Sequence, residues 1–362
     1  MSTRRFALLY LAPVVLLLAW RIAPLVGGGE TLFLRDVFNV HLPMKWAEAE
    51  ALRAGTIPLV DPYRASGQPL ASNPNAVPFY PDNLLYLAAP LLWALNAHFW
   101  LYLLVAPLFM YALGCALGLG RLAVWAAGVC YGFSGFFAAQ MSFYNLVAGA
   151  ALAPALAAAM VAAAKALGSR SQGGFAAVAG LLWALLLTAG DPLTALLGLA
   201  VAASLLLVVT RRPRPGEGQL LRPRWTGSTG RLAVALAAGT LTALPQIVEF
   251  LRIVPLSFRG YYGYSPAART IASFDPRQAL EWLVPFAFGR PDLLRAGSFW
   301  GHRVYTDTPP YYFTLYPGLL ALALVAAAGL PPRRPAGRGD DDGDGRPPGA
   351  PAAAGCEPRR LA

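Results

Sequence analysis

The amino-acid sequence predicts an all-α, polytopic membrane protein, and three observations support this prediction. Apolar residues make up 57% of the 362 residues and charged residues only 13%, about half the charged share of an ordinary soluble chain. Long Ala/Leu/Val runs recur along the chain, and the charges gather between them. No Asp or Glu falls inside these runs, where an acid at mid-bilayer costs roughly 2.5 to 3.5 kcal/mol on insertion scales.

Eight of the apolar runs approach the roughly 20 residues that a helix needs to cross the hydrocarbon core of a membrane. They are 6–26, 97–119, 122–140, 146–167, 175–190, 193–210, 232–248 and 311–330. A ninth run, 84–95, is too short to cross alone and contains Pro90. We expect it to be an interfacial or re-entrant piece.

The distribution of cations predicts a cytoplasmic N-terminus. Arg4 and Arg5 precede the first run, and no small-residue cleavage site follows it, so we expect an uncleaved first span. With this orientation every short inner loop carries Lys or Arg, whereas the short outer loops 141–145 and 191–192 carry none. The net charge of +11 does not indicate nucleic acid as a partner, because the cations are scattered between apolar runs.

The first outer segment, 27–96, opens with a predicted amphipathic helix. Its apolar stripe is spaced by three and four residues after Asp36: Val37, Val40, Met44, Ala47 and Ala51. We expect this helix to lie on the bilayer surface, with Lys45, Glu48 and Arg53 turned away from the stripe. The sequence leaves two roles open for Asp36, which are the N-cap of this helix and a general base for an incoming hydroxyl.

Six prolines between residues 58 and 81 exclude a helix from the next stretch and disfavour sheet. Apolar residues alternate with these prolines, so we expect an ordered, extended loop that caps the helix bundle. They are Ile57, Leu59, Tyr63, Leu70, Phe79 and Tyr80.

The second large outer segment, 249–310, contains Ser257-Phe-Arg-Gly-Tyr-Tyr-Gly-Tyr264. The planar fork of Arg259 suits a phosphate group, and Tyr hydroxyls add donors. The alternative is an Arg/Tyr anchor at a span end. His41 lies five residues from Asp36, which is off its helical face, and the three cysteines lack metal-ligand spacing. We predict no metal, although one acid and a substrate phosphate can together hold Mg²⁺ or Mn²⁺.

Inside the predicted bundle, the motifs favour packing. Gly114-x-x-x-Gly118 and Gly128-x-x-x-Gly132 permit close approach of helices. Gly190-Asp191-Pro192 predicts a hairpin in which Asp191 caps the helix that Pro192 begins.

Several spaced motifs occur together in residues 34–329. They are Arg35-Asp36 with Pro43, Gly55-x-x-Pro-Leu-x-x-Pro-Tyr63, Gly67-Gln-Pro-Leu70, Phe79-Tyr-Pro81, Phe133-Ser-Gly-Phe136 and Ser257-x-Arg259. In these motifs the chain resembles the bacterial YfhO-type membrane proteins. That family belongs with the GT-C superfamily of glycosyltransferases, which move a sugar from a polyprenyl-phosphate carrier to an acceptor at the outer leaflet.

The resemblance implies a multi-pass protein of the bacterial cytoplasmic (inner) membrane, with a cell-envelope glycan or lipid as acceptor. It makes Asp36 the candidate catalytic base. Asp61 is a second, weaker catalytic candidate, because this chain has Val60-Asp61 where the family often has Trp-Asn. The candidate substrate-binding residues are Arg35, His41, Lys45, Tyr80, Ser257, Arg259 and Tyr264. No cofactor is implied.

The chain departs from the family after residue 330, where the transmembrane domain 1–330 gives way to an Asp/Gly/Arg/Pro-rich tail, 331–362. Such a tail cannot bury a core, so we expect disorder. Family members continue with further spans, so we expect a truncated or frame-shifted product. Two alternatives to a transferase stay open: a lipid-linked substrate transporter or flippase, and an inactive truncated membrane protein. A transporter predicts ionisable groups inside the membrane, and the eight runs lack acids.

Overall fold

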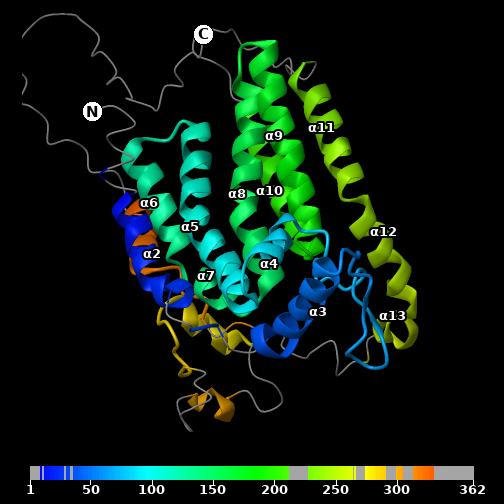
Figure 1. Ribbon diagram of the computed structural model, residues 1–362. Coiled ribbons are helices and arrows are strands. Elements are labelled where there is room, and N and C mark those ends of the chain that lie inside the picture. Colours follow the sequence, from blue (N-terminus) through cyan, green and yellow to red (C-terminus); the bar gives the residue numbers. More distant parts are fainter. Residues whose placement is uncertain are drawn as a thin grey trace, which may run out of the picture.

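The computed structural model describes residues 9, 12–27, 30–32, 36–211, 227–263, 265, 274–290, 299–304, 312 and 314–329. This part of the chain is mostly helical (Figure 1). Its one sheet is a two-residue antiparallel ladder, in which β1 (Val60–Asp61) pairs with β2 (Gln68–Pro69). The predicted tail, 331–362, lies outside the described residues.

The α-helices are α2 (Ala12–Gly27), α3 (Leu42–Arg53), α4 (Leu85–Ala88), α5 (Leu91–Leu117), α6 (Arg121–Gly132), α7 (Gly135–Gln140), α8 (Tyr144–Lys165), α9 (Ser169–Thr188), α10 (Pro192–Arg211), α11 (Ser228–Thr242), α12 (Leu244–Ile253), α13 (Phe258–Tyr262) and α15 (Leu319–Ala328). The shorter turns are the π-helix η2 (Val37–His41) and the 3-10 helices η3 (Pro81–Leu84), η4 (Val254–Leu256), η5 (Pro276–Trp282) and η6 (Trp300–Arg303). Short connections join the helices from α4 to α10, whereas the proline-rich loop separates α3 from η3.

Five stretches in the described part are long and apolar enough to cross a membrane, which is compatible with a multi-pass membrane protein. They are α5, α6 with α7, α8, α9 and α10. The helices α11 and α12 would add a sixth span, bent by 58°. The predicted helical membrane fold is therefore confirmed in outline. The count of eight spans stays a prediction, since α2 and α15 are helices of 16 and 10 residues.

Helix α8 lies at the centre of the bundle, between α5 on one side and α9 and α10 on the other (Figure 1). Small residues bring the helices together. A Cβ on Gly180 of α9 would collide with the backbone oxygen of Ala235 in α11, and one on Gly239 would collide with that of Gly180. Helices α9 and α11 therefore touch backbone to backbone.

The predicted packing role of the glycine motifs is confirmed at three positions. Gly114 faces Val124, and both Gly128 and Gly132 face Pro107, so these glycines set the α5–α6 contact. Gly118 instead ends α5 in the left-handed conformation, with φ of +80°. This is the usual C-terminal position of a glycine after a helix.

The hairpin predicted at residues 190–192 is also confirmed. Helix α10 begins at Pro192, and the Oδ2 atom of Asp191 accepts a hydrogen bond of 3.0 Å from the backbone N–H of Thr194. Gly190 has φ of +87°, and a Cβ there would collide with the backbone oxygen of Pro74. The proline-rich loop therefore rests on this hairpin, as expected of a loop that caps the bundle.

The boundary predicted between the run 84–95 and the following span is wrong. Residues 91–95 form the first turn of α5, and only residues 81–88 form separate short helices, η3 and α4. The break falls at Pro90, whose extended backbone precedes the helix and whose carbonyl accepts the N–H of Ala94 at 2.9 Å. Pro90 separates α4 from α5, and the apolar run continues into α5 because proline is well tolerated at the start of a helix.

Candidate functional site

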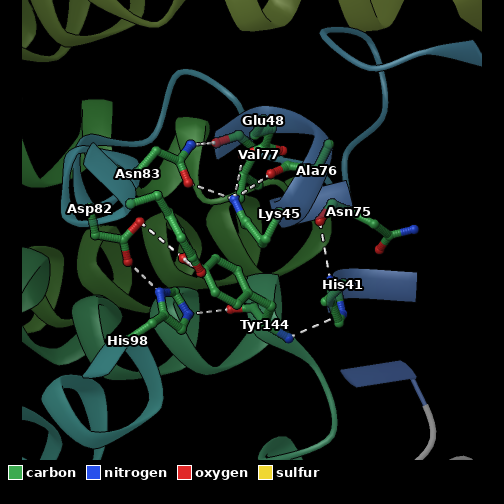
Figure 2. A network of polar contacts seen from close by, with 11 residues as sticks. His41, Lys45, Glu48, Asn75, Ala76, Val77, Asp82, Asn83, His98 and Tyr144 are labelled. Atoms are coloured by element: carbon green, nitrogen blue, oxygen red, sulfur yellow. Dashed lines mark hydrogen bonds and ion pairs between the residues drawn. The ribbon is translucent and has the colours of Figure 1, made fainter. Parts of the chain in front are cut away.

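A network of buried polar side chains lies where residues 36–90 pack on the N-terminal ends of α5, α8 and α10. We call this the polar end of the bundle; α3 and α4 lie there, in the lower half of Figure 1. Figure 2 shows its central network, which joins α3, the proline-rich loop, η3, α5 and α8. The network is formed by His41, Lys45, Glu48, Asn75, Asp82, Asn83, His98 and Tyr144.

Lys45 forms the centre of this network and is fully buried. Its ammonium group donates to Glu48 Oε2 at 2.9 Å, to the Ala76 carbonyl at 2.6 Å and to Asn83 Oδ1 at 2.6 Å. The Nζ atom also lies 4.5 Å from the centroid of the Tyr144 ring. All three ammonium protons therefore have acceptors. Lys45 and Glu48, predicted to lie off the apolar stripe, are nevertheless buried, because the loop and η3 bring acceptors to Lys45, which itself pairs with Glu48.

Glu48 is buried with only one of its oxygens paired. Its Oε1 atom has no hydrogen-bond partner within the described structure. Burial raises the pKa of Glu48 to about 7, and the nearby Lys45 opposes this shift. A buried carboxylate with one free oxygen is costly, so the pair depends on the bonds that Lys45 makes.

Asp82 and His98 form a second, adjoining unit. Asp82 Oδ2 pairs with His98 Nδ1, while His98 Nε2 lies 2.7 Å from the Tyr144 carbonyl oxygen. A neutral imidazole donates from one nitrogen only, so satisfying both contacts requires one more proton, on His98 or on Asp82. The Tyr144 hydroxyl donates to Asp82 Oδ1 at 3.3 Å, and its ring stacks on His98. This unit ties η3 to α5 and α8.

His41 closes the network from the π-helical turn η2. Its Nδ1 lies 3.2 Å from the Asn75 carbonyl, and its Nε2 lies 3.2 Å from the Tyr144 backbone nitrogen. The first contact needs a donor and the second an acceptor, which is the pattern of a neutral imidazole. Burial lowers the pKa of His41 to about 3, so the ring is neutral at physiological pH.

Three of the predicted substrate-binding residues lie at the polar end: His41, Lys45 and Tyr80. Tyr80 is buried, its hydroxyl pairs with that of Tyr102, and its ring contacts His98 edge-on. Burial raises the pKa of Tyr80 well above its ordinary value. These three side chains hold the loop and α3 against the bundle.

Asp36 and Asp61, the two catalytic candidates, lie in different environments. Asp36 is partly exposed, and its carboxylate makes no hydrogen bond to another described residue. It stands at the predicted N-cap position, before η2, but without the side-chain bond of a cap. Asp61 is 2% exposed, and its Oδ1 accepts the backbone N–H of Tyr63 at 3.0 Å. This bond is a local turn contact, which gives Asp61 a structural role.

The remaining predicted residues lie elsewhere. Ser257 caps α13, where its hydroxyl accepts from Gly260 N at 3.0 Å and donates to the Val254 carbonyl. Arg35 and Tyr264 lie outside the described residues, as does the side chain of Arg259.

The proline-rich loop packs through fewer side chains than expected. Leu70 and Tyr80 are buried, whereas Ile57, Leu59 and Tyr63 are 65%, 53% and 61% exposed. Leu70 packs with Met44 and Ala47 of α3. Backbone carbonyls of the loop, those of Asn75 and Ala76, also accept bonds from η2 and α3.

Sequence reasoning missed Asp82, Asn83, His98 and Tyr144. The sequence does indicate His98, because Asn96 and His98 are polar residues within the otherwise apolar first turns of α5. The pairing of His98 with Asp82 is tertiary, and nothing in the local pattern indicates it. No cluster of three His, Cys, Asp or Glu side chains suited to a metal occurs among the residues that the structure describes.

Comparison of the chain with protein-family models, with curated proteins and with solved structures finds no match. The resemblance to the YfhO-type proteins accordingly stays a prediction from the motifs.

Proposed function

We propose that this protein is a GT-C type glycosyltransferase, in which Asp36 deprotonates an acceptor hydroxyl. The sugar donor would be linked to a polyprenyl phosphate, and the acceptor would be a cell-envelope glycan or lipid. The observation that supports this proposal is the state of Asp36, a partly exposed carboxylate with no hydrogen bond to another described residue. In this proposal the polar end faces outward from the bacterial cytoplasmic membrane, the N-terminus is cytoplasmic, and about eight spans surround the site.

The surroundings of Asp36 support a catalytic role over a structural one. Its neighbour Val37 is fully buried, and the turn that follows is anchored by His41 and Lys45. This turn is π-helical, a rare geometry found frequently at functional sites. A general base needs a fixed position within reach of the hydroxyl that it deprotonates. The buried network would supply the fixed position, and the exposure of Asp36 would supply the reach.

The proposed reaction is a displacement at the anomeric carbon of the sugar. The acceptor oxygen forms its bond to that carbon as the bond to the phosphate oxygen breaks. The acceptor proton goes to the Asp36 carboxylate, and the bonding electrons leave with the polyprenyl phosphate. Arg259, with Ser257, Tyr264 and Arg35, is proposed to bind this phosphate through charge-assisted hydrogen bonds. No resident cofactor is proposed, and Mg²⁺ or Mn²⁺ would enter only with the donor.

The test is transfer by the purified, reconstituted protein from a panel of synthetic polyprenyl-phosphate sugars, with and without Mg²⁺ or Mn²⁺. Asp36→Asn should lower the rate at least about 100-fold, the usual contribution of a general base. Asp61→Asn is the matched control, because an amide oxygen can still accept the Tyr63 N–H; we expect near wild-type transfer. In a deletion strain, an Asp36→Asn protein that inserts correctly and restores the glycolipid profile as well as wild type would refute the assignment.

A second candidate, a transporter of lipid-linked substrates, is favoured by one observation. His98 lies two turns inside the apolar helix α5 and is paired with an acid, Asp82. Such a pair can move a proton in a coupled carrier. Flipping of a fluorescent polyprenyl-phosphate sugar in proteoliposomes, driven by a pH gradient and lost in His98→Gln, would support this candidate over the transferase.

A further inference from the structure

A groove of about 560 Å³ lies between α8 and α10, with α5, α6 and α7 along its other side. Most of its lining is apolar, and Leu193, Leu197 and Val201 of α10 are more than half exposed at its rim. In a membrane these side chains would face lipid. The groove therefore opens toward the bilayer, and its occupant would come from there.

The length of the groove matches one lipid leaflet. On one side, the groove is lined by residues from Asp191, just before α10, to Val201 within it. Ten residues of helix span about 15 Å, which is half of the hydrocarbon thickness. Helix α8 begins at the same end of the bundle as α10, and its lining residues run from Leu146 to Ala157. One acyl chain fits this path.

The end of the groove nearest the polar end carries unsatisfied hydrogen-bonding capacity. Gln140 lines the groove and is 2% exposed, and its Oε1 has no partner in the described structure. Its amide nitrogen lies 3.3 Å from the Tyr312 hydroxyl. Asp191 also lines the groove and uses Oδ2 to cap α10. A buried polar atom without a partner is costly, so a ligand that supplies hydrogen bonds here would bind favourably.

The charge of the groove selects among headgroups. None of the described lining residues is Lys, Arg or His, while Asp191 is an acid. A negatively charged phosphate would be repelled by the Asp191 carboxylate and would find no cation among the described lining residues. A hydroxyl can donate to the Asp191 carboxylate, and it satisfies the Gln140 amide in either orientation because it both donates and accepts.

We propose that this groove binds a neutral membrane lipid with a hydroxyl-bearing headgroup. One chain would lie along α10, and the headgroup hydroxyls would bind Gln140 and Asp191. In the proposed transferase this lipid is the acceptor, an assignment that rests on the proposed function. The anionic carrier would bind elsewhere, because the groove offers its phosphate no cation.

The experiment measures which lipid the protein retains. Full-length protein is placed in nanodiscs with equal amounts of dioleoyl monoglucosyl-diacylglycerol and dioleoyl-phosphatidylglycerol, and retained lipids are counted by native mass spectrometry. We expect about a tenfold preference for the glucolipid, the effect of one or two net hydrogen bonds. Equal retention, or a preference for phosphatidylglycerol, would overturn the proposal.

Variants separate the chain path from the headgroup site. Leu197→Trp fills the groove and should lower retention of both lipids about tenfold, whereas Val208→Trp, on exposed α10 surface outside the lining, should not. Asp191→Asn keeps a capping oxygen but removes the charge, so retention of phosphatidylglycerol should rise about fivefold. A gain of this kind cannot come from misfolding. Unchanged retention in Leu197→Trp would also overturn the groove assignment.

The two proposals fail separately. If the reconstituted protein transfers sugar from none of the donors while the lipid preference holds, the groove stands and the acceptor assignment falls. If the preference is absent while Asp36→Asn abolishes transfer, the transferase stands and the groove proposal falls.

Discussion

The polar end and the helical half of the molecule are stabilised by different interactions. At the polar end, the buried side chains of Lys45, Glu48, Asp82 and His98 each depend on a partner. For Lys45, Asp82 and His98 that partner comes from another element, and for Glu48 it is Lys45 of the same helix. Between α9 and α11, two glycines and an alanine bring the backbones into contact, and Arg231 of α11 donates to the neutral side chains of Gln172 and Ser169 at one end of α9. The first region tolerates the loss of a partner poorly, because an unpaired group stays buried. The glycine contacts of the second region are instead sensitive to added volume.

Removing the Lys45 ammonium should have the largest effect. Lys45→Met leaves a buried glutamate, an amide oxygen and a carbonyl without their donor, so we expect a loss of about 3 to 5 kcal/mol of unfolding free energy. The measurement is SDS-induced unfolding in mixed micelles.

Two further variants sharpen this result. Lys165→Met removes an exposed lysine that bonds one carbonyl, and we expect a loss of less than about 1 kcal/mol. Glu48→Leu added to Lys45→Met should recover part of the stability, since it removes the uncompensated acid. If the double variant is less stable than Lys45→Met alone, the two side chains do not act as a pair.

Adding a methyl group between α9 and α11 should have the next largest effect. Gly180→Ala places a Cβ against the Ala235 carbonyl oxygen, so the helices must separate. We expect a loss of about 2 to 3 kcal/mol. Gly174→Ala on the same helix is the control, because its Cβ meets nothing within 4 Å; there the better helix propensity of Ala should stabilise by up to about 1 kcal/mol. Equal effects at the two sites would refute a close α9–α11 contact.

The pH dependence of stability tests the neutral state of His41. Burial lowers its pKa from 6.5 to about 3, so the unfolded chain binds more protons than the folded one in that window, and unfolding free energy rises with pH. Between pH 5 and 6.5 the gain is about 2 kcal/mol. Glu48 has the opposite sign, because burial raises its pKa from 4.5 to about 7 and stability falls as pH rises through that window.

The two contributions are separated in a Glu48→Gln background. There we expect the full His41 slope between pH 5 and 6.5, and no such slope when His41→Gln is added. Thermal unfolding in detergent at a series of pH values gives the comparison. A slope that persists in the double variant would assign the titration to another group.

The helices were more predictable than the site. Runs of Ala, Leu and Val place α8 and α10 to within two residues, whereas the run for α9 begins six residues late; the predicted cap of α10, Asp191, is confirmed. The site could be read only in part. His41, Lys45 and Tyr80 were named as candidates, but they were expected to bind substrate, and the structure shows them holding the loop and α3 against the bundle. Their partners come from residues up to about a hundred positions away, so no local pattern indicates them.

Runs of consecutive residues are enough to indicate a helical chain that is apolar enough to span a membrane, because helix length and hydrophobicity are local properties. The burial of Lys45 and Glu48, the pairing of Asp82 with His98 and the partial exposure of Asp36 follow from the fold instead. A buried charge needs hydrogen-bond partners, and the folded proline-rich loop and η3 bring those of Lys45 and His98 from distant parts of the chain.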